Sequence, residues 1–191
     1  MAHLDTLRAI IRTLRRAQIP VSYSKGYNPH MNIYMSPSMP LGIPSLCEYC
    51  AADADIDCEQ FLKAYNEHCV KGLECIKAFK TAKNPNLAAN ITSALYNVKS
   101  AYLRDNAPKI LREGLIVEKW NKGNVIKEDA GEYIIGIEPT ADGANVHLKF
   151  GNKGNLRADS FLRALNLSDC AIVKYQMYCG QKSVDDFIAD Y

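Results

Sequence analysis

The sequence predicts an α+β protein with two ferredoxin-like halves and antiparallel sheets, one over 1–84 and one over 85–191. In the second half the apolar patterns follow the order strand, helix, strand, strand, helix, strand, which is that of a ferredoxin-like unit. The first half has the order helix, strand, strand, helix, strand, so the same unit is predicted there without its opening strand. Because that strand is central in this topology, we expect another segment or chain to fill its place.

Composition supports a globular protein. The 191 residues are 48% hydrophobic and 23% charged, which is the balance of an ordinary soluble domain. The sequence starts without a basic, apolar leader, and no run of apolar residues is long enough to span a membrane. The seven cysteines are an odd number scattered through apolar patterns, which is typical of a reducing compartment. We therefore expect a cytoplasmic protein with no membrane contact and no structural disulfide.

The first half opens with an amphipathic helix over 4–17, which ends before Pro20. The elements predicted after it are, in chain order, an extended segment at 21–24, a tight loop marked by Gly26 and Asn28-Pro29, a short strand at 33–35, an extended segment at 47–55, a helix from the capping residue Asp57 to about His68, and a strand at 73–80.

The boundary between the halves is placed at Asn84-Pro85-Asn86, where apolar periodicity stops on both sides. The elements predicted beyond it are a strand at 95–103, a helix capped by Asp105 with Pro108 in its first turn, a strand at 115–121, a hairpin of 133–139 and 145–150, a helix at 158–165 and a strand at 171–179.

Positive charge is concentrated near the start of the chain. The formal net charge is only +2, from 23 Lys+Arg against 21 Asp+Glu. The first helix nevertheless carries Arg8, Arg12 and Arg15, and no acid lies between Asp5 and Glu48. Salt bridges to acidic residues one helical turn away are therefore not expected to neutralise these arginines. It is either a solvated helix face or a surface that binds phosphates.

The densest polar cluster is the loop 24–30, of sequence Ser-Lys-Gly-Tyr-Asn-Pro-His. Ser24, Lys25 and backbone N–H groups could hold phosphates, Tyr27 could stack on a base, and Asn28 and His30 could make directional contacts. The alternative is a turn in which the serine and asparagine side chains satisfy their own backbone.

His3, Asp5 and His30 are the catalytic candidates. In an enzyme His30 would be the general acid or base, Asp5 would orient it, and Lys25 or Arg8 would stabilise an anion. No metal site is predicted, because the two-residue spacing of His3 and Asp5 puts them on different helix faces. Cys47 and Cys50 form a C-x-x-C within an extended segment, without a second pair of ligands.

A family resemblance rests on several pieces of the first 50 residues: His3-Leu4-Asp5, Leu14-Arg15-Arg16-Ala17, Pro20-Val21-Ser22-Tyr23-Ser24, Gly26-Tyr27-Asn28-Pro29-His30 and Pro40-Leu41-Gly42. Glu48-Tyr49, Leu156-Arg157 and 161–165 continue it. Together they resemble the bacterial radical-SAM-linked family, a domain of unknown function fused to, or encoded beside, radical SAM proteins. Relatives have a further strand and a serine where this chain has Met1-Ala2, and Pro-Lys where it has Met31-Asn32.

The resemblance implies a setting for the function. Radical SAM enzymes hold an iron–sulfur cluster on a cysteine triplet that this chain lacks, so the cluster and S-adenosylmethionine would belong to a partner, with no cofactor here. The family's setting beside ribosomal and RNA-processing genes implies RNA or a ribosomal component as substrate. The leading hypothesis is a cytoplasmic accessory or substrate-binding module, for RNA, that works with a radical SAM protein. The alternatives are a stand-alone enzyme with a His30/Asp5 acid–base site and a protein-interaction scaffold, with homo-oligomer formation or strand donation at the incomplete first half.

Overall fold

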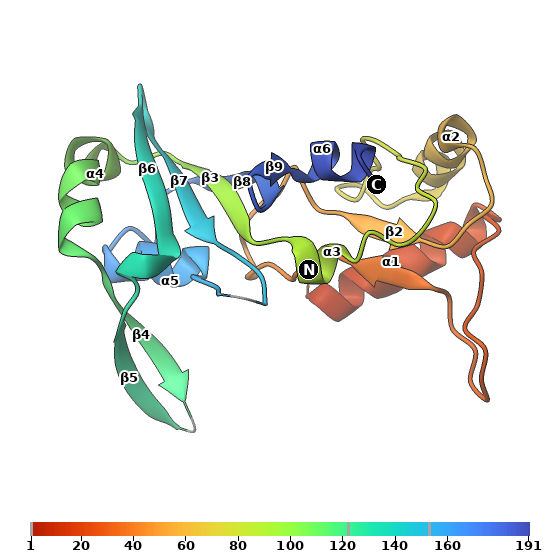
Figure 1. Ribbon diagram of the computed structural model, residues 1–191, viewed down its shortest axis with the longest axis horizontal. Coiled ribbons are helices and arrows are strands. Elements are labelled where there is room, and N and C mark those ends of the chain that lie inside the picture. Colours follow the sequence, from red (N-terminus) through yellow and green to blue (C-terminus); the bar gives the residue numbers. More distant parts are fainter. Residues whose placement is uncertain (1, 122, 153) are drawn as a thin grey trace. The chain divides into compact units, whose positions relative to one another are not determined.

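The computed structural model describes residues 2–121, 123–152 and 154–191 (Figure 1). The chain forms two compact units, and neither is one continuous stretch of sequence. Unit 1 consists of the residues up to Leu41 together with 49–88 and 185–191, whereas unit 2 consists of 42–48 and 89–184. Residues 42–48 therefore belong to unit 2 although they interrupt the sequence of unit 1, and residues 185–191 belong to unit 1 although they follow the sequence of unit 2.

Helices and strands are mixed along the chain, and all the laddered strands pair in small antiparallel sheets. The predicted α+β class is confirmed. The division into two ferredoxin-like halves stays a prediction.

The elements found in unit 1 are α1 (His3–Arg16), β1 (Ile33–Met35), β2 (Cys50–Ala52), α2 (Cys58–His68), the start of α3 (Leu87–Asn90) and most of α6 (Val184–Ala189). The predicted first helix, the strand at 33–35 and the second helix are confirmed. Asp57 caps α2 as predicted, because its carboxylate accepts the N–H of Glu59 at 2.8 Å and that of Gln60 at 3.4 Å. The predicted strand at 73–80 was wrong: these residues join no ladder in the described chain.

The small sheet of unit 1 packs next to α1. β1 and β2 pair antiparallel with Ile33 opposite Ala52, and Val21 extends the pairing by a bridge to Ala54. The buried core of this unit is Ile10, Leu14, Ile19, Val21, Met31 and Tyr65. The apolar face of α1 lies in this core, so its arginines are left on the outer face.

The elements found in unit 2 are β3 (Ser93–Val98), α4 (Ala101–Glu113), β4 (Ile116–Asn121), β5 (Asn124–Asp129), the 3₁₀ turn η1 (Gly131–Tyr133), β6 (Ile134–Thr140), β7 (Gly143–Lys149), α5 (Ala158–Ala164), β8 (Ile172–Cys179) and β9 (Lys182–Ser183). Five strands form one antiparallel sheet in the order β6-β7-β3-β8-β9. The predicted hairpin of 133–139 and 145–150 and the predicted last strand are confirmed as β6–β7 and β8.

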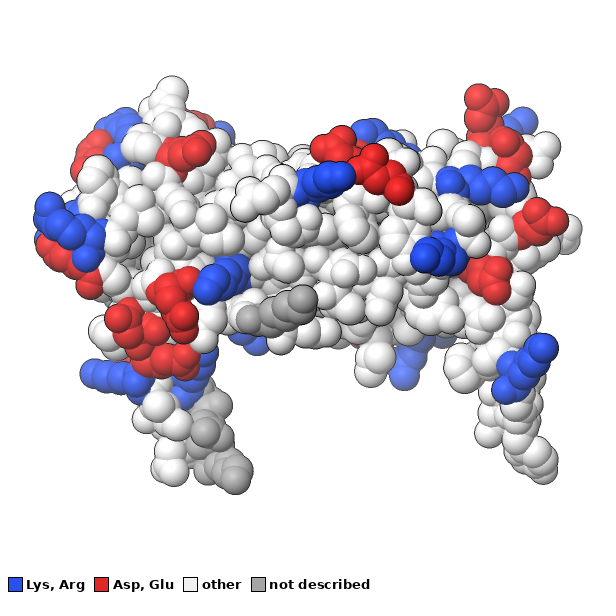
Figure 2. Space-filling view, viewed as in Figure 1, with Lys and Arg blue, Asp and Glu red and all other residues white. Residues whose placement is uncertain are grey.

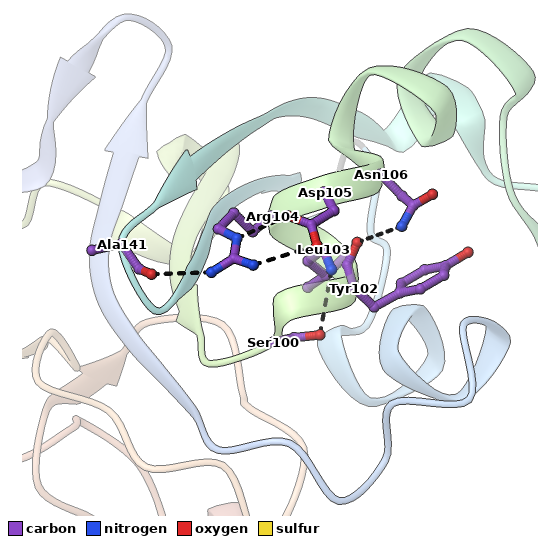
Figure 3. A network of polar contacts seen from close by, with 7 residues as sticks. All are labelled: Ser100, Tyr102, Leu103, Arg104, Asp105, Asn106 and Ala141. Atoms are coloured by element: carbon purple, nitrogen blue, oxygen red, sulfur yellow. Dashed lines mark hydrogen bonds and ion pairs between the residues drawn. The ribbon is translucent and has the colours of Figure 1, made fainter.

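The start of α4 differs from the prediction. The helix begins directly after Ser100, whose Oγ accepts the N–H of Leu103 at 3.4 Å (Figure 3). β3 ends at Val98 rather than at 103. Asp105 was wrongly predicted as the cap: it lies within α4, where its carboxylate pairs with the guanidinium of Arg104 at 2.8 Å. Pro108 therefore lies in the helix interior, where it removes one hydrogen bond, rather than in the first turn.

The predicted strand at 115–121 exists as β4, but its partner is β5, which the sequence did not predict. The two strands form a separate two-stranded sheet, with Ile116 opposite Asp129 and Lys119 opposite Ile126. Most positions of β5 are exposed, so the strand lacks the alternation of apolar and polar residues by which strands are recognised.

The segment 42–48 is held on β8 by its backbone and by a buried lysine. The carbonyl of Pro44 accepts the N–H of Lys174 at 3.0 Å, and the N–H of Leu46 donates to the carbonyl of Lys174 at 2.9 Å. The Lys174 side chain is fully buried and forms an ion pair with Glu48. Its Nζ lies 4.6 Å from the centroid of the Phe150 ring. This packing accounts for the assignment of 42–48 to unit 2.

Candidate functional site

The arginines of α1 differ in their partners. Contrary to the expectation that pairing one turn apart leaves these arginines unneutralised, Arg8 forms an exposed ion pair with Asp5, at 3.2 Å between Nη1 and Oδ1. Arg16 donates to the carbonyl of His68 at 2.7 Å, which ties the end of α1 to the end of α2. Arg12 and Arg15 are exposed, and no hydrogen bond or ion pair joins either side chain to another described residue. Arg12 and Arg15 therefore provide most of the positive charge that α1 offers to a ligand.

The loop 24–30 forms the end of a hairpin that follows α1. Tyr23 and Met31 form an antiparallel bridge at its base. The N–H of Ser24 donates to the carbonyl of His30 at 2.8 Å, and the N–H of His30 donates to Ser24 Oγ at 3.1 Å. Figure 1 shows this hairpin, in orange, extending beyond the helices and strands of unit 1. Residues 25–29 are thus displayed on a closed loop.

The ring of His30 is oriented by its own loop. Its Nδ1 lies 3.1 Å from the carbonyl oxygen of Asn28 and 3.3 Å from Ser24 Oγ. A carbonyl can only accept, so the contact with Asn28 requires the proton on Nδ1. In the neutral ring, Nε2 is then left as an acceptor for a ligand.

Lys25 and Tyr27 are displayed at the end of the loop. The side chain of Tyr27 is 101% exposed, so no neighbouring residue covers its ring. Lys25 is also exposed. Figure 2 shows a basic side chain on the same projecting hairpin, and the sequence has no acid between Asp5 and Glu48. An anion and an aromatic group could both be bound here.

The three catalytic candidates are not joined by hydrogen bonds. Asp5 pairs with Arg8, while the His30 ring bonds to Ser24 and Asn28. His3 is exposed at the first turn of α1. Within the described ranges, no group of three or more His, Cys, Asp and Glu side chains is arranged to hold a metal ion.

Exposed aromatic rings near the loop were not singled out from the sequence. Tyr23, at the base of the hairpin, is 45% exposed and Tyr34 on β1 is 49% exposed. Val21 is buried whereas Ser22 and Tyr23 are both exposed, so strict alternation does not reveal the outer position of this ring. The sequence feature that could have indicated Tyr23 as a further binding residue is its short distance from Tyr27 along the chain.

No helix in the described part of the chain combines the length and the apolar composition needed to cross a bilayer. The fold and the surface together define an α+β protein whose α1 and following hairpin present unpaired cations and an exposed ring. The chain belongs to the family described as an uncharacterized protein conserved in bacteria (DUF2344), whose family model matches residues 1–158. No curated protein and no solved structure matches the chain.

Proposed function

We propose that this protein is a cytoplasmic substrate-binding module for RNA that works with a radical SAM partner. Its RNA surface would consist of the outer face of α1 and the loop 24–30. The observation that carries the proposal is the exposure of Arg12 and Arg15, which have no acidic partner among the described residues. Both residues belong to the same unit as the projecting loop.

Cations and backbone phosphates account for most of the affinity in such a surface. Arg12, Arg15 and Lys25 would contact phosphates directly. Arg8 would join them after exchanging its exposed contact with Asp5, which costs little because exposed ion pairs contribute weakly to stability. This part of the binding is independent of base sequence.

The loop would supply the contacts to bases. The uncovered ring of Tyr27 offers a face on which a base can stack. The Asn28 side chain and His30 Nε2 would make directional hydrogen bonds, and the hydroxyl of Ser24 can still donate while its oxygen accepts from His30. These contacts favour unpaired bases, because stacking on Tyr27 requires a free base face.

The arrangement gives less support to a stand-alone enzyme. That hypothesis requires Asp5 to orient His30, whereas the Nδ1 atom of His30 lies 3.1 Å from the carbonyl oxygen of Asn28 and 3.3 Å from Ser24 Oγ. In the RNA proposal any radical chemistry is performed by the partner, which would hold the iron–sulfur cluster and S-adenosylmethionine. Support for this partner comes from the motif around Gly26-Tyr27-Asn28-Pro29-His30 that resembles the radical-SAM-linked family.

The RNA proposal is tested by the affinity of the full chain for a fluorescent single-stranded RNA. We expect Arg12→Ala/Arg15→Ala to weaken binding roughly tenfold at moderate salt. The matched control is Lys109→Ala/Arg112→Ala, which removes two exposed cations from α4. Equal losses in both variants would show that only net charge matters and would contradict a defined surface on α1.

The partner proposal is tested separately by purifying the tagged chain from bacterial cells. We expect a protein with a radical SAM cysteine triplet to copurify with the wild type. Copurification of RNA without such a protein would contradict the proposed radical SAM partner but not the proposed RNA-binding surface. A protein-interaction scaffold predicts the opposite result, with protein and no RNA in the eluate.

A further inference from the structure

The five-stranded sheet of unit 2 has two faces that differ in burial and chemistry. Strand register places alternate residues on one face, and those of the first face are mostly buried and, apart from Lys174, apolar; they include Ala94, Tyr96, Val98, Val146, Leu148 and Met177. α4 packs against β6 and β7, and Leu103, Ala107 and Ile110 are its buried residues. The opposite face is half-buried and mixed in chemistry: it carries the polar or aromatic residues Asn97, Asn145, His147, Lys149, Gln176 and Tyr178, together with the apolar Leu95 and Val173.

An aromatic pair lies on the central strands of this second face. The rings of His147 on β7 and Tyr178 on β8 have centroids 5.0 Å apart at an interplanar angle of 42°. Between their strands, the buried hydroxyl of Ser93 on β3 lies 2.8 Å from His147 Nε2 and fixes the orientation of that ring. Burial lowers the pKa of His147 and so favours its uncharged form, although the nearby Glu138 opposes the shift. The two rings form a preordered aromatic surface.

Polar groups adjoin the rings on the same face. Asn97 and Asn145 lie opposite each other, and Asn97 Nδ2 donates to Asn145 Oδ1 at 3.0 Å. This contact uses one donor and leaves the carbonyl oxygen of Asn97 and the amide group of Asn145 for further hydrogen bonds. Amide side chains of this kind can bond to the edges of unpaired bases.

One cation, Lys149, and one exposed carboxylate, Glu138 on β6 opposite Asn145, complete the face. Lys149 follows His147 by two residues on β7 and therefore points to the same side of the sheet. Its Nζ lies 5.3 Å from the centroid of the Tyr133 ring, and it forms no ion pair with a carboxylate of the described chain. It is available to a phosphate next to the aromatic pair.

We propose that this open sheet face binds unpaired bases of single-stranded RNA, with the rings of Tyr178 and His147 as the stacking surface. Rings, amides and a cation on one sheet match the base faces, base edges and phosphates of a single strand. A duplex would hide its base faces from these rings. The choice of RNA rests on the proposed function, whereas the site is a different one, in unit 2.

The test follows the ring resonances of His147 and Tyr178 by NMR in the full chain. We expect both to shift saturably with a ten-nucleotide single-stranded RNA and to stay unchanged with a duplex of the same strand. Unchanged rings at concentrations that saturate the Lys25 resonances would overturn the inference. Equal shifts with the duplex would overturn it as well.

Variants separate this site from the surface on α1. Tyr178→Leu should weaken single-strand binding roughly tenfold, because it removes one stacking ring, and Tyr178→Phe should keep wild-type affinity. In Arg12→Ala/Arg15→Ala the ring shifts should persist with lower overall affinity. If the ring shifts persist and Arg12→Ala/Arg15→Ala binds RNA as tightly as the wild type, the result contradicts the surface on α1 but not the site on the sheet. If Tyr178→Leu is poorly folded, Lys149→Ala replaces it, and wild-type affinity in that variant would count against the site.

Discussion

His30 and Ser24 close the loop by two reciprocal contacts. The N–H of Ser24 donates to the carbonyl of His30 at 2.8 Å, and the N–H of His30 donates to Ser24 Oγ at 3.1 Å. The residues between them are held near one geometry before any ligand arrives. Binding then loses less conformational freedom than it would with an open loop.

Ser24→Ala removes one of these contacts without removing a charge. We expect the affinity for single-stranded RNA to fall about two- to tenfold, the range of a single hydrogen bond. The melting temperature should change little, because water can reach the freed N–H of the exposed His30. Ser38→Ala, at an exposed serine outside the loop, is the matched control. Wild-type affinity in Ser24→Ala would show that loop closure does not contribute to binding.

Tyr27 tests the stacking contact. Tyr27→Ala should weaken single-strand binding about fivefold or more, the size of one base–aromatic stack. Tyr27→Phe should bind like the wild type, since the ring face is kept. Neither change should alter thermal stability, because the ring is fully exposed. Fluorescence anisotropy and thermal unfolding check both statements, and a Tyr27→Phe variant as weak as Tyr27→Ala would argue for the hydroxyl instead.

Asp185 links the C-terminal segment to unit 1 and predicts a pH dependence. Burial alone would raise the pKa of its carboxyl, but hydrogen bonds from Lys77 and Tyr49, both at 2.7 Å, outweigh it and lower the pKa below 3.8. The resulting stabilisation is present above pH 3.8 and is lost as the pH falls through the lowered value. Asp185→Asn should therefore melt below the wild type at pH 6, and the difference should shrink at pH 3. A difference that stays constant between these pH values would contradict the ionic contact.

Lys174 predicts a large effect on stability. Lys174→Ala removes a fully buried side chain and leaves Glu48 without this cation, so the free energy of unfolding should fall by roughly 2–4 kcal/mol. Lys174→Met keeps most of the volume and should lose less. Urea unfolding measures both, with Lys109→Ala as the exposed control. A Lys174→Ala variant as stable as that control would show that the buried pair does not hold the segment 42–48.

Local signals predicted much of this fold, and long-range contacts account for most errors. The spacing of Leu4, Leu7 and Ile11 and the cap at Asp57 are local, and the helices that they predict are present. Ser100 and Asp105 are both good capping residues, and α4 begins after Ser100, close behind the point where the pairing of β3 with β7 and β8 ends at Val98. The sequence could not show this choice.

The buried Lys174 is the clearest case of a feature hidden from the sequence. A lysine within a strand is normally placed on the solvent face. Here it faces Glu48, which is far away along the chain, and the backbone around Pro44 pairs with the same strand. Only the tertiary fold brings these groups together.

For the candidate site, the sequence identified the exposed groups better than their partners. Arg12, Arg15, Lys25 and Tyr27 are exposed, as binding by these groups requires. The hydroxyl of Ser24 and the ring of His30 also form hydrogen bonds with the backbone of their own loop, as predicted by the alternative of a turn whose side chains bond to its backbone. The aromatic pair on the open sheet face was missed, because His147 and Tyr178 belong to strands that are distant in sequence.

The salt dependence of RNA binding tests the central claim most directly. For a single strand, the slope of log K against log salt is about −0.7 for each neutralised phosphate. Arg12→Ala/Arg15→Ala should therefore reduce the steepness of this slope by roughly 1.4, and Lys109→Ala/Arg112→Ala should leave it unchanged. A slope in the α1 variant equal to that of the wild type would contradict an RNA-binding surface on α1.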